Sequence, residues 1–101
     1  MPEKVSFSII WTDKAMAGST EIKLYLRYYF SETEIDNYLK LLESFEKIIL
    51  SFPQLYPLSG KNKKVRRAVL SKQLSVFYSL KAEFITIVAV LDNRMSDARR
   101  P

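Results

Sequence analysis

Three consecutive strands are predicted by residues 65–94, which read VRRAVLSKQLSVFYSLKAEFITIVAVLDNR. The three strand patterns are a basic-led stretch, an alternating stretch and a nearly continuous β-branched and apolar run, at Val65–Leu70, Leu74–Leu80 and Phe84–Leu91. Such an apolar run is typical of a central strand buried on both faces. The connections between the patterns are short enough for antiparallel hairpins. We therefore expect three neighbouring antiparallel strands.

The N-terminal part of the chain predicts a further strand and a first helix. Apolar side chains alternate along residues 5–11, which is the pattern of a half-buried strand. Apolar residues then recur on one helical face at Ile22, Tyr25, Leu26 and Tyr29. Thr12 or Asp13 can cap this helix, although Gly18 weakens its first turn and leaves Ser19 as an alternative cap.

A second helix has the strongest local pattern in the chain. Ser31 and Glu34 form a capping box, in which each side chain can accept a hydrogen bond from the other residue's backbone amide. Apolar residues follow at helical spacing at Ile35, Tyr38, Leu42, Phe45, Ile49 and Phe52. Pro53 ends the helix, because proline lacks the amide that a helix needs. We assign this aromatic stripe to the core.

The order of these elements predicts an α+β fold. We expect one domain over residues 1–101 with the order β-α-α-β-β-β, a mostly antiparallel sheet and a helical hairpin packed on one face. The length of 101 residues and the hydrophobic content of 48% fit a single globular domain. The other face of the sheet is left free for binding.

The composition narrows the possible chemistry. The chain has no cysteine and no histidine, so disulfides, thiolate metal sites and the commonest general base are excluded. We expect no metal, no cofactor and no small-molecule substrate. The N-terminus has no apolar block typical of a signal peptide, and no stretch approaches the roughly 18 apolar residues of a transmembrane helix. We therefore expect a soluble, cytoplasmic protein without a membrane partner.

The net charge of +5 is distributed unevenly along the chain. Residues 1–46 carry five Lys or Arg and eight Asp or Glu, whereas residues 47–101 carry eleven and three. No acidic residue lies between Glu46 and Glu83, and within that interval cations gather at Lys61, Lys63, Lys64, Arg66, Arg67, Lys72 and Lys81. A one-sided cationic surface fits a polyanion or an acidic protein. The alternative is a solvated basic loop without a partner.

Four local patterns, taken in order, resemble those of a known toxin family. They are Phe52-Pro53 at the end of the helical hairpin, the basic-led strand Val65–Leu70, the pair Phe77-Tyr78, and Ile85–Leu91 running into Asp92-Asn93-Arg94. Over residues 5–98 the chain is similar to the RelE/ParE superfamily, the toxins of bacterial type II toxin–antitoxin (plasmid stabilisation) systems.

The resemblance implies a protein partner and two alternative targets. RelE-like members are ribosome-dependent nucleases that cut messenger RNA, ParE-like members inhibit DNA gyrase, and both are silenced by a cognate antitoxin that wraps the toxin. Such antitoxins bring acidic, partly disordered segments, which suit a basic sheet. We expect poor solubility or dimerisation when the chain is expressed without its antitoxin.

RNA cleavage needs a base, an acid and stabilisation of the charge on phosphorus. The resemblance implies Arg66 and Arg94 as functional positions, and a nuclease would add Lys64 and Tyr78. However, the position of the usual nuclease arginine is Ser75, and the segment after Arg94 has neither Tyr nor His. We therefore expect a ParE-like blocking toxin; the alternatives are an mRNA endoribonuclease and a non-toxic nucleic-acid-binding module.

The orientation of the strand residues decides which side chains are available. Arg66 and Arg67 are adjacent and must point to opposite faces. The family pattern favours Arg66 on the open face and leaves Arg67 to pair with an acid on the helices. Tyr78 alternates with apolar residues and is expected in the core. The predicted target-binding surface consists of Lys61, Lys63, Lys64, Arg66, Arg94, Arg99 and Arg100.

Overall fold

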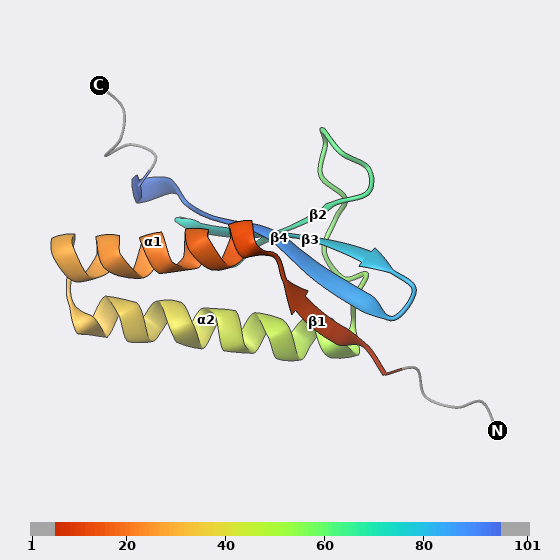
Figure 1. Ribbon diagram of the computed structural model, residues 1–101, viewed down its shortest axis with the longest axis horizontal. Coiled ribbons are helices and arrows are strands. Elements are labelled where there is room, and N and C mark those ends of the chain that lie inside the picture. The colour runs from red at the N-terminus through yellow and green to blue at the C-terminus, as the bar shows by residue number, and fades with distance from the viewer. Residues whose placement is uncertain (1–5, 96–101) are drawn as a thin grey trace.

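The structure is a computed structural model that describes residues 6–95. The elements in chain order are β1 (Ser8–Trp11), α1 (Asp13–Tyr29), α2 (Glu32–Ser51), β2 (Arg66–Val69), β3 (Leu74–Lys81) and β4 (Phe84–Asp92). This is the predicted order β-α-α-β-β-β, and α1 and α2 form the predicted helical hairpin (Figure 1). The α+β fold class is therefore confirmed.

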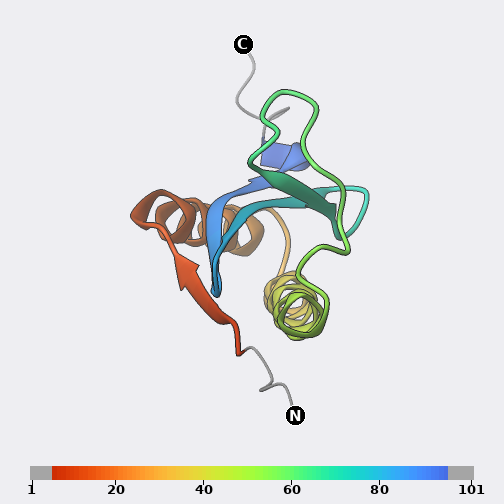
Figure 2. The ribbon, with the colours of Figure 1, turned by 90° about the vertical axis from the view of Figure 1, so that its right-hand side faces the viewer.

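The four strands form one mixed sheet in the order β1-β4-β3-β2. The pairs β2–β3 and β3–β4 are antiparallel, as the short connections predict, and β1 joins the other side of β4 in parallel. Figure 2 shows the loop between α2 and β2 running from the end of α2, along the edge of the sheet, to a turn beyond β2. The core lies between the helices and the sheet and includes Phe45, Tyr78, Ile85 and Ile87.

Local side chains explain where the helices begin and end. Thr12 is the N-cap of α1 and accepts a hydrogen bond from the Ala15 amide, so the alternative cap at Ser19 is wrong. Ser19 instead lies inside α1, where its hydroxyl is hydrogen-bonded at 2.7 Å to the buried Tyr38 hydroxyl of α2. Ser31 caps α2 as predicted, and α2 ends at Ser51, before Pro53.

The prediction that β4 is buried on both faces is wrong. Ile85 and Ile87 are fully buried against the helices, whereas Phe84 is 43% and Leu91 is 53% exposed. Phe84 lies on the opposite face by the ordinary alternation of a strand, and Leu91 lies there because a register shift near Tyr78 changes which later β4 residues face the helices. Within residues 6–95 the helices cover one face only. The apolar run of β4 therefore supplies both a core and an uncovered surface.

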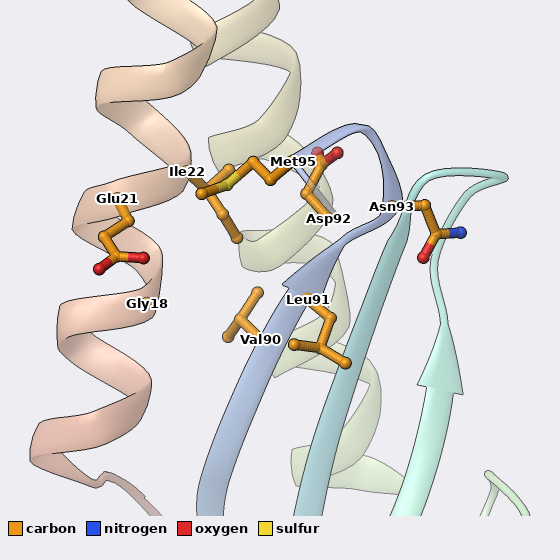
Figure 3. A pocket seen from close by; sticks show the side chains of 8 residues that line it. All are labelled: Gly18, Glu21, Ile22, Val90, Leu91, Asp92, Asn93 and Met95. Atoms are coloured by element: carbon orange, nitrogen blue, oxygen red, sulfur yellow. The ribbon is translucent and has the colours of Figure 1, made fainter. Parts of the chain in front are cut away.

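Helix α1 lies close to β4 along the part of the strand that β1 does not pair with. β1 pairs only with the first half of β4, from Phe84 to Ile87. Beside the second half runs α1, where a Cβ on Gly18 would lie 3.5 Å from the Val90 carbonyl oxygen. Figure 3 shows the small cavity that remains here, about 170 Å³, between Gly18 and Ile22 on α1 and Val90 to Met95.

Candidate functional site

A basic hollow on the described surface lies between the loop after α2 and the end of the β3–β4 hairpin. Its volume is about 690 Å³. We call it the basic groove; its lining residues are Gln54, Leu58, Lys63, Lys64, Val65, Arg66, Ser79, Leu80, Lys81 and Val88. Four of these side chains are cationic and none is acidic. The groove is therefore suited to a ligand with several negative charges.

Backbone hydrogen bonds hold the loop that forms one wall of the basic groove. Leu58 bridges to Arg66 in antiparallel register, so the loop runs beside β2. The Ser59 amide donates to the Val65 carbonyl at 2.6 Å, and the Arg67 amide donates to the Pro57 carbonyl at 2.9 Å. The Asn62 side chain accepts from the Lys64 amide at 2.9 Å, which tightens the turn. The exposed side chains of Lys63 and Lys64 are thus carried by a backbone that these hydrogen bonds hold in place.

The predicted orientation of Arg66 and Arg67 is wrong. Ala68 is fully buried, and residues two apart on a strand share a face, so Arg66 points toward the helix side. There the Arg66 Nη1 donates to the Tyr56 carbonyl at 2.7 Å and to the Gln54 carbonyl at 3.3 Å. Arg67 points to the open face, with its guanidinium 5.8 Å from the centre of the Phe77 ring. The burial of Ala68 fixes which face of β2 each arginine occupies, and the family pattern did not indicate this orientation.

Tyr78 lies in the core, as predicted. Its side chain is fully buried, and its hydroxyl donates to the Pro53 carbonyl at 2.7 Å. Burial is the main cause that raises the pKa of Tyr78 above the ordinary value of 10.0, while the nearby charge of Arg66 acts in the opposite direction. The hydroxyl therefore stays protonated near neutral pH and donates its hydrogen bond to the loop after α2.

Arg94 lies far from the basic groove. Its guanidinium donates to Asp92 at 2.8 and 3.1 Å and to Glu34 at 3.4 Å, and it lies 5.0 Å from the centre of the Phe30 ring. The hydrogen bonds to Asp92 are the main cause of a raised Arg94 pKa. Glu34 and Gln54 are at opposite ends of α2, about 30 Å apart at 1.5 Å per residue. The predicted target-binding residues therefore do not form one surface: Arg66 lies at the basic groove, and Arg94 lies near the other end of α2.

The structure brings Lys63, Lys64 and Arg66 together at the basic groove and adds Lys81, which was not among the predicted site residues. Lys81 is the last residue of β3 and belongs to the same acid-free interval of the sequence, and that interval was the available signal. Lys61 is exposed on the same loop. Arg99 and Arg100 lie outside the described residues.

The basic groove can neutralise anionic groups, but its lining offers few groups for proton transfer. Lysine and arginine side chains supply positive charge and hydrogen-bond donors. Ser75, at the position of the usual nuclease arginine, is 4% exposed and lies on β3 outside the groove lining. Among residues 6–95, no three His, Cys, Asp or Glu side chains are grouped as they would be to hold a metal ion. The groove lining therefore offers positive charge and hydrogen-bond donors to an anionic group.

Comparison with known proteins identifies the class of fold. No protein-family model matches the sequence, and no curated protein is similar to it. Among solved structures, a chain of the "chromosomal ParDE TA system from P. aeruginosa" is 20% identical, with a TM-score of 0.71 over 88% of this chain and 98% of that one. A chain of the "E. coli DinJ-YafQ toxin-antitoxin complex" is 12% identical, with a TM-score of 0.61 over 90% and 97%.

A third solved structure, "YafQ from E. coli strain BL21(DE3)", is 16% identical, with a TM-score of 0.52 over 89% of this chain and 97% of that one. Together these likenesses show that the chain has the RelE/ParE-like fold, as the sequence patterns predict. In the described part of the chain, neither helix has the length and apolar character needed to span a membrane.

Proposed function

We propose that this chain is the toxin of a bacterial type II toxin–antitoxin pair and that it arrests growth by binding and blocking a macromolecular target. The observation that carries the proposal is the basic groove, with four cations and no carboxylate in its lining, on a RelE/ParE-like fold. Tyr78, which is paired with Arg66 in the sheet, has its hydroxyl bonded to the Pro53 carbonyl. A groove of this kind binds anionic surfaces more readily than it moves protons.

DNA gyrase is the proposed target, because the sequence resembles the superfamily while lacking two parts of its nuclease pattern. Position 75 is a buried serine, and the sequence after Arg94 has neither Tyr nor His. A toxin that blocks its target needs a binding surface but no general base. The proposed site of action is the bacterial cytoplasm.

A cognate antitoxin is the proposed protein partner. The uncovered sheet face exposes the apolar residues Ile10, Val69, Phe84 and Leu91. Large exposed apolar surfaces often mark protein interfaces. Two of the similar solved structures carry titles that describe toxin–antitoxin assemblies, which supports the same kind of partner here. An acidic antitoxin segment would also complement the cationic loop.

The proposal is tested by inducing the chain alone in a bacterial host and measuring growth, an SOS reporter and transcript ends. We expect growth arrest with an SOS response and intact transcripts. The groove variant Lys63→Ala plus Lys64→Ala should lose most of the arrest. The matched control is Lys14→Ala plus Lys40→Ala, which removes two exposed lysines from the helices and should retain it.

Two results would overturn the proposal in different ways. Codon-phased cuts in transcripts, lost in the groove variant, would identify a ribosome-dependent endoribonuclease in which Lys64 and Arg66 stabilise charge. No arrest at all, combined with nucleic-acid binding that falls steeply with salt, would identify a non-toxic binding module.

A further inference from the structure

We propose that Arg66 is a positioning residue: it holds the loop that carries the groove lysines and does not itself contact the anionic partner. The inference rests on the proposed function of the basic groove. It reverses the role that the family pattern gives to this arginine. The geometry of its guanidinium is the starting point.

Arg66 is connected to the segment that leaves α2. Its Nη1 donates to the carbonyl oxygens of Gln54 and Tyr56, the residues directly after the end of the helix. The last turn of α2 contains no basic residue, so the negative end of the helix dipole has no cation of its own. The guanidinium supplies a positive charge to the segment three to five residues beyond that end. Both hydrogen bonds are charge-assisted because the donor is ionised, and the bond to Tyr56 is the shorter of the two.

Backbone pairing with β2 holds the same limb of the loop a few residues further on. Leu58 is paired with Arg66, and the amides of Ser59 and Arg67 donate to carbonyls across this pairing. The backbone pairing at Leu58 and the Arg66 side chain at Gln54 and Tyr56 thus hold the same limb of the loop, the one that leaves α2. Tyr78, opposite Arg66 in the sheet, adds a third anchor through its bond to Pro53.

Such anchoring matters because the lysines repel one another. Lys63, Lys64 and Lys81 line the groove without a carboxylate in its lining to hold them together. An unanchored loop would move these like charges apart and would lose conformational entropy when an anionic partner ordered it. A loop already held by Arg66 avoids most of that loss. The effect of Arg66 on binding would then operate entirely through the lysines.

The charge-preserving substitution Arg66→Lys separates positioning from contact. Lysine keeps the positive charge but has a shorter stem and a strongly hydrated ammonium group in place of the planar guanidinium. A residue that acts as a point charge on a phosphate should tolerate this exchange. A residue that bridges two carbonyl oxygens should not. Arg66→Gln removes the charge as well and serves as the second variant.

Two measurements on the purified full chain test the proposal. Amide hydrogen exchange followed by NMR reports on the loop at Ser59 and Arg67. Fluorescence anisotropy with a labelled 12-nucleotide oligothymidylate, between about 50 and 300 mM salt, reports on the groove as an anion site. Near-ultraviolet circular dichroism confirms that each variant is folded. Arg67→Lys, a substitution on the opposite face of the same strand, is the matched control.

We expect Arg66→Lys and Arg66→Gln to accelerate exchange at Ser59 and Arg67 by roughly tenfold or more, because a charge-assisted anchor is lost. We expect Arg66→Lys to weaken oligothymidylate binding by roughly tenfold with an unchanged dependence on salt. Wild-type exchange and affinity in Arg66→Lys, with weakened binding in Arg66→Gln alone, would overturn the proposal and make Arg66 a direct contact.

A separate variant tests the proposed function on which this inference rests. Lys63→Ala plus Lys64→Ala should leave loop exchange unchanged and reduce the slope of log affinity against log salt by about 1.4, which is two single-strand phosphate contacts. An unchanged slope would show that the groove is not the anion site. The exchange data on Arg66 would still show whether it holds the loop, so the two failures are distinguishable.

Discussion

The cationic side chains near the two ends of α2 have different kinds of partner. At the N-terminal end, Arg94 is enclosed by Asp92, Glu34 and the Phe30 ring. At the C-terminal end, Arg66 donates to two carbonyl oxygens, and no carboxylate is among the described residues that line the basic groove with the lysines. An arginine that already has carboxylate partners stabilises the fold, whereas unpaired lysines remain available to an external anion. The difference separates a structural cluster from a candidate binding surface.

The largest expected effect on stability comes from the paired end. The Asp92 side chain is 1% exposed and accepts hydrogen bonds from the backbone and the guanidinium of Arg94. Asp92→Ala removes all of these bonds and leaves a partly buried cation with Glu34 alone. We expect a loss of about 3 kcal/mol in the free energy of unfolding, measured by urea denaturation.

Glu34→Ala is the matched control for that experiment. The Glu34 side chain is 39% exposed and its contact with Arg94 is longer, at 3.4 Å. Its removal should cost less than about 1 kcal/mol, as for other solvent-screened ion pairs. A larger loss for Glu34→Ala than for Asp92→Ala would contradict the view that Asp92 is the main partner of Arg94.

An intermediate effect is expected from Tyr38, in the first half of α2. Burial raises the Tyr38 pKa, so the hydroxyl is protonated near neutral pH and available to Ser19, 2.7 Å away. Tyr38→Phe keeps the ring but leaves the buried Ser19 hydroxyl without this partner. We expect a loss of about 1–2 kcal/mol in the free energy of unfolding.

A double-mutant cycle with Ser19→Ala checks the cause. The double variant removes both polar groups and should be destabilised by clearly less than the sum of the two single changes. Additive losses would mean that the two hydroxyls do not stabilise the helical hairpin through their mutual hydrogen bond.

Most of the fold was predictable because local signals agreed with one another. The Ser31 cap, the apolar stripe of α2 and the short hairpin connections each determined an element, and all are present, although Phe52, assigned to the stripe, is the C-cap and 64% exposed. Two predictions failed for a common reason. The burial of β4 and the orientation of Arg66 depend on what covers each sheet face, and that is a tertiary property. Ala68 could have indicated the orientation: its small apolar side chain is buried on the face that the helices cover, whereas its neighbours Arg67 and Val69 are exposed on the other face.

The candidate site was predictable only in part. The acid-free interval from Glu46 to Glu83 correctly indicated a cationic surface, and Lys63 and Lys64 line the resulting groove. Asp92, two positions from Arg94, was open to prediction as its partner, but the sequence could not show the pairing with Glu34, which lies 60 positions away along the chain. Spatial pairing of charges, and not their number, decides which cations are available.

The smallest expected effect on stability comes from the unpaired end and gives the sharpest test of the comparison. Lys63 and Lys64 are exposed, and neither side chain takes part in an ion pair found within residues 6–95. Lys63→Ala plus Lys64→Ala should therefore change the free energy of unfolding by less than about 0.5 kcal/mol, with a slight gain because like charges are removed. The control pair Lys14→Ala plus Lys40→Ala should be equally neutral in the same urea denaturation. A loss above about 1 kcal/mol in the groove variant would place these lysines among the structural cations with Arg94, and any loss of growth arrest would then report unfolding instead of a damaged binding surface.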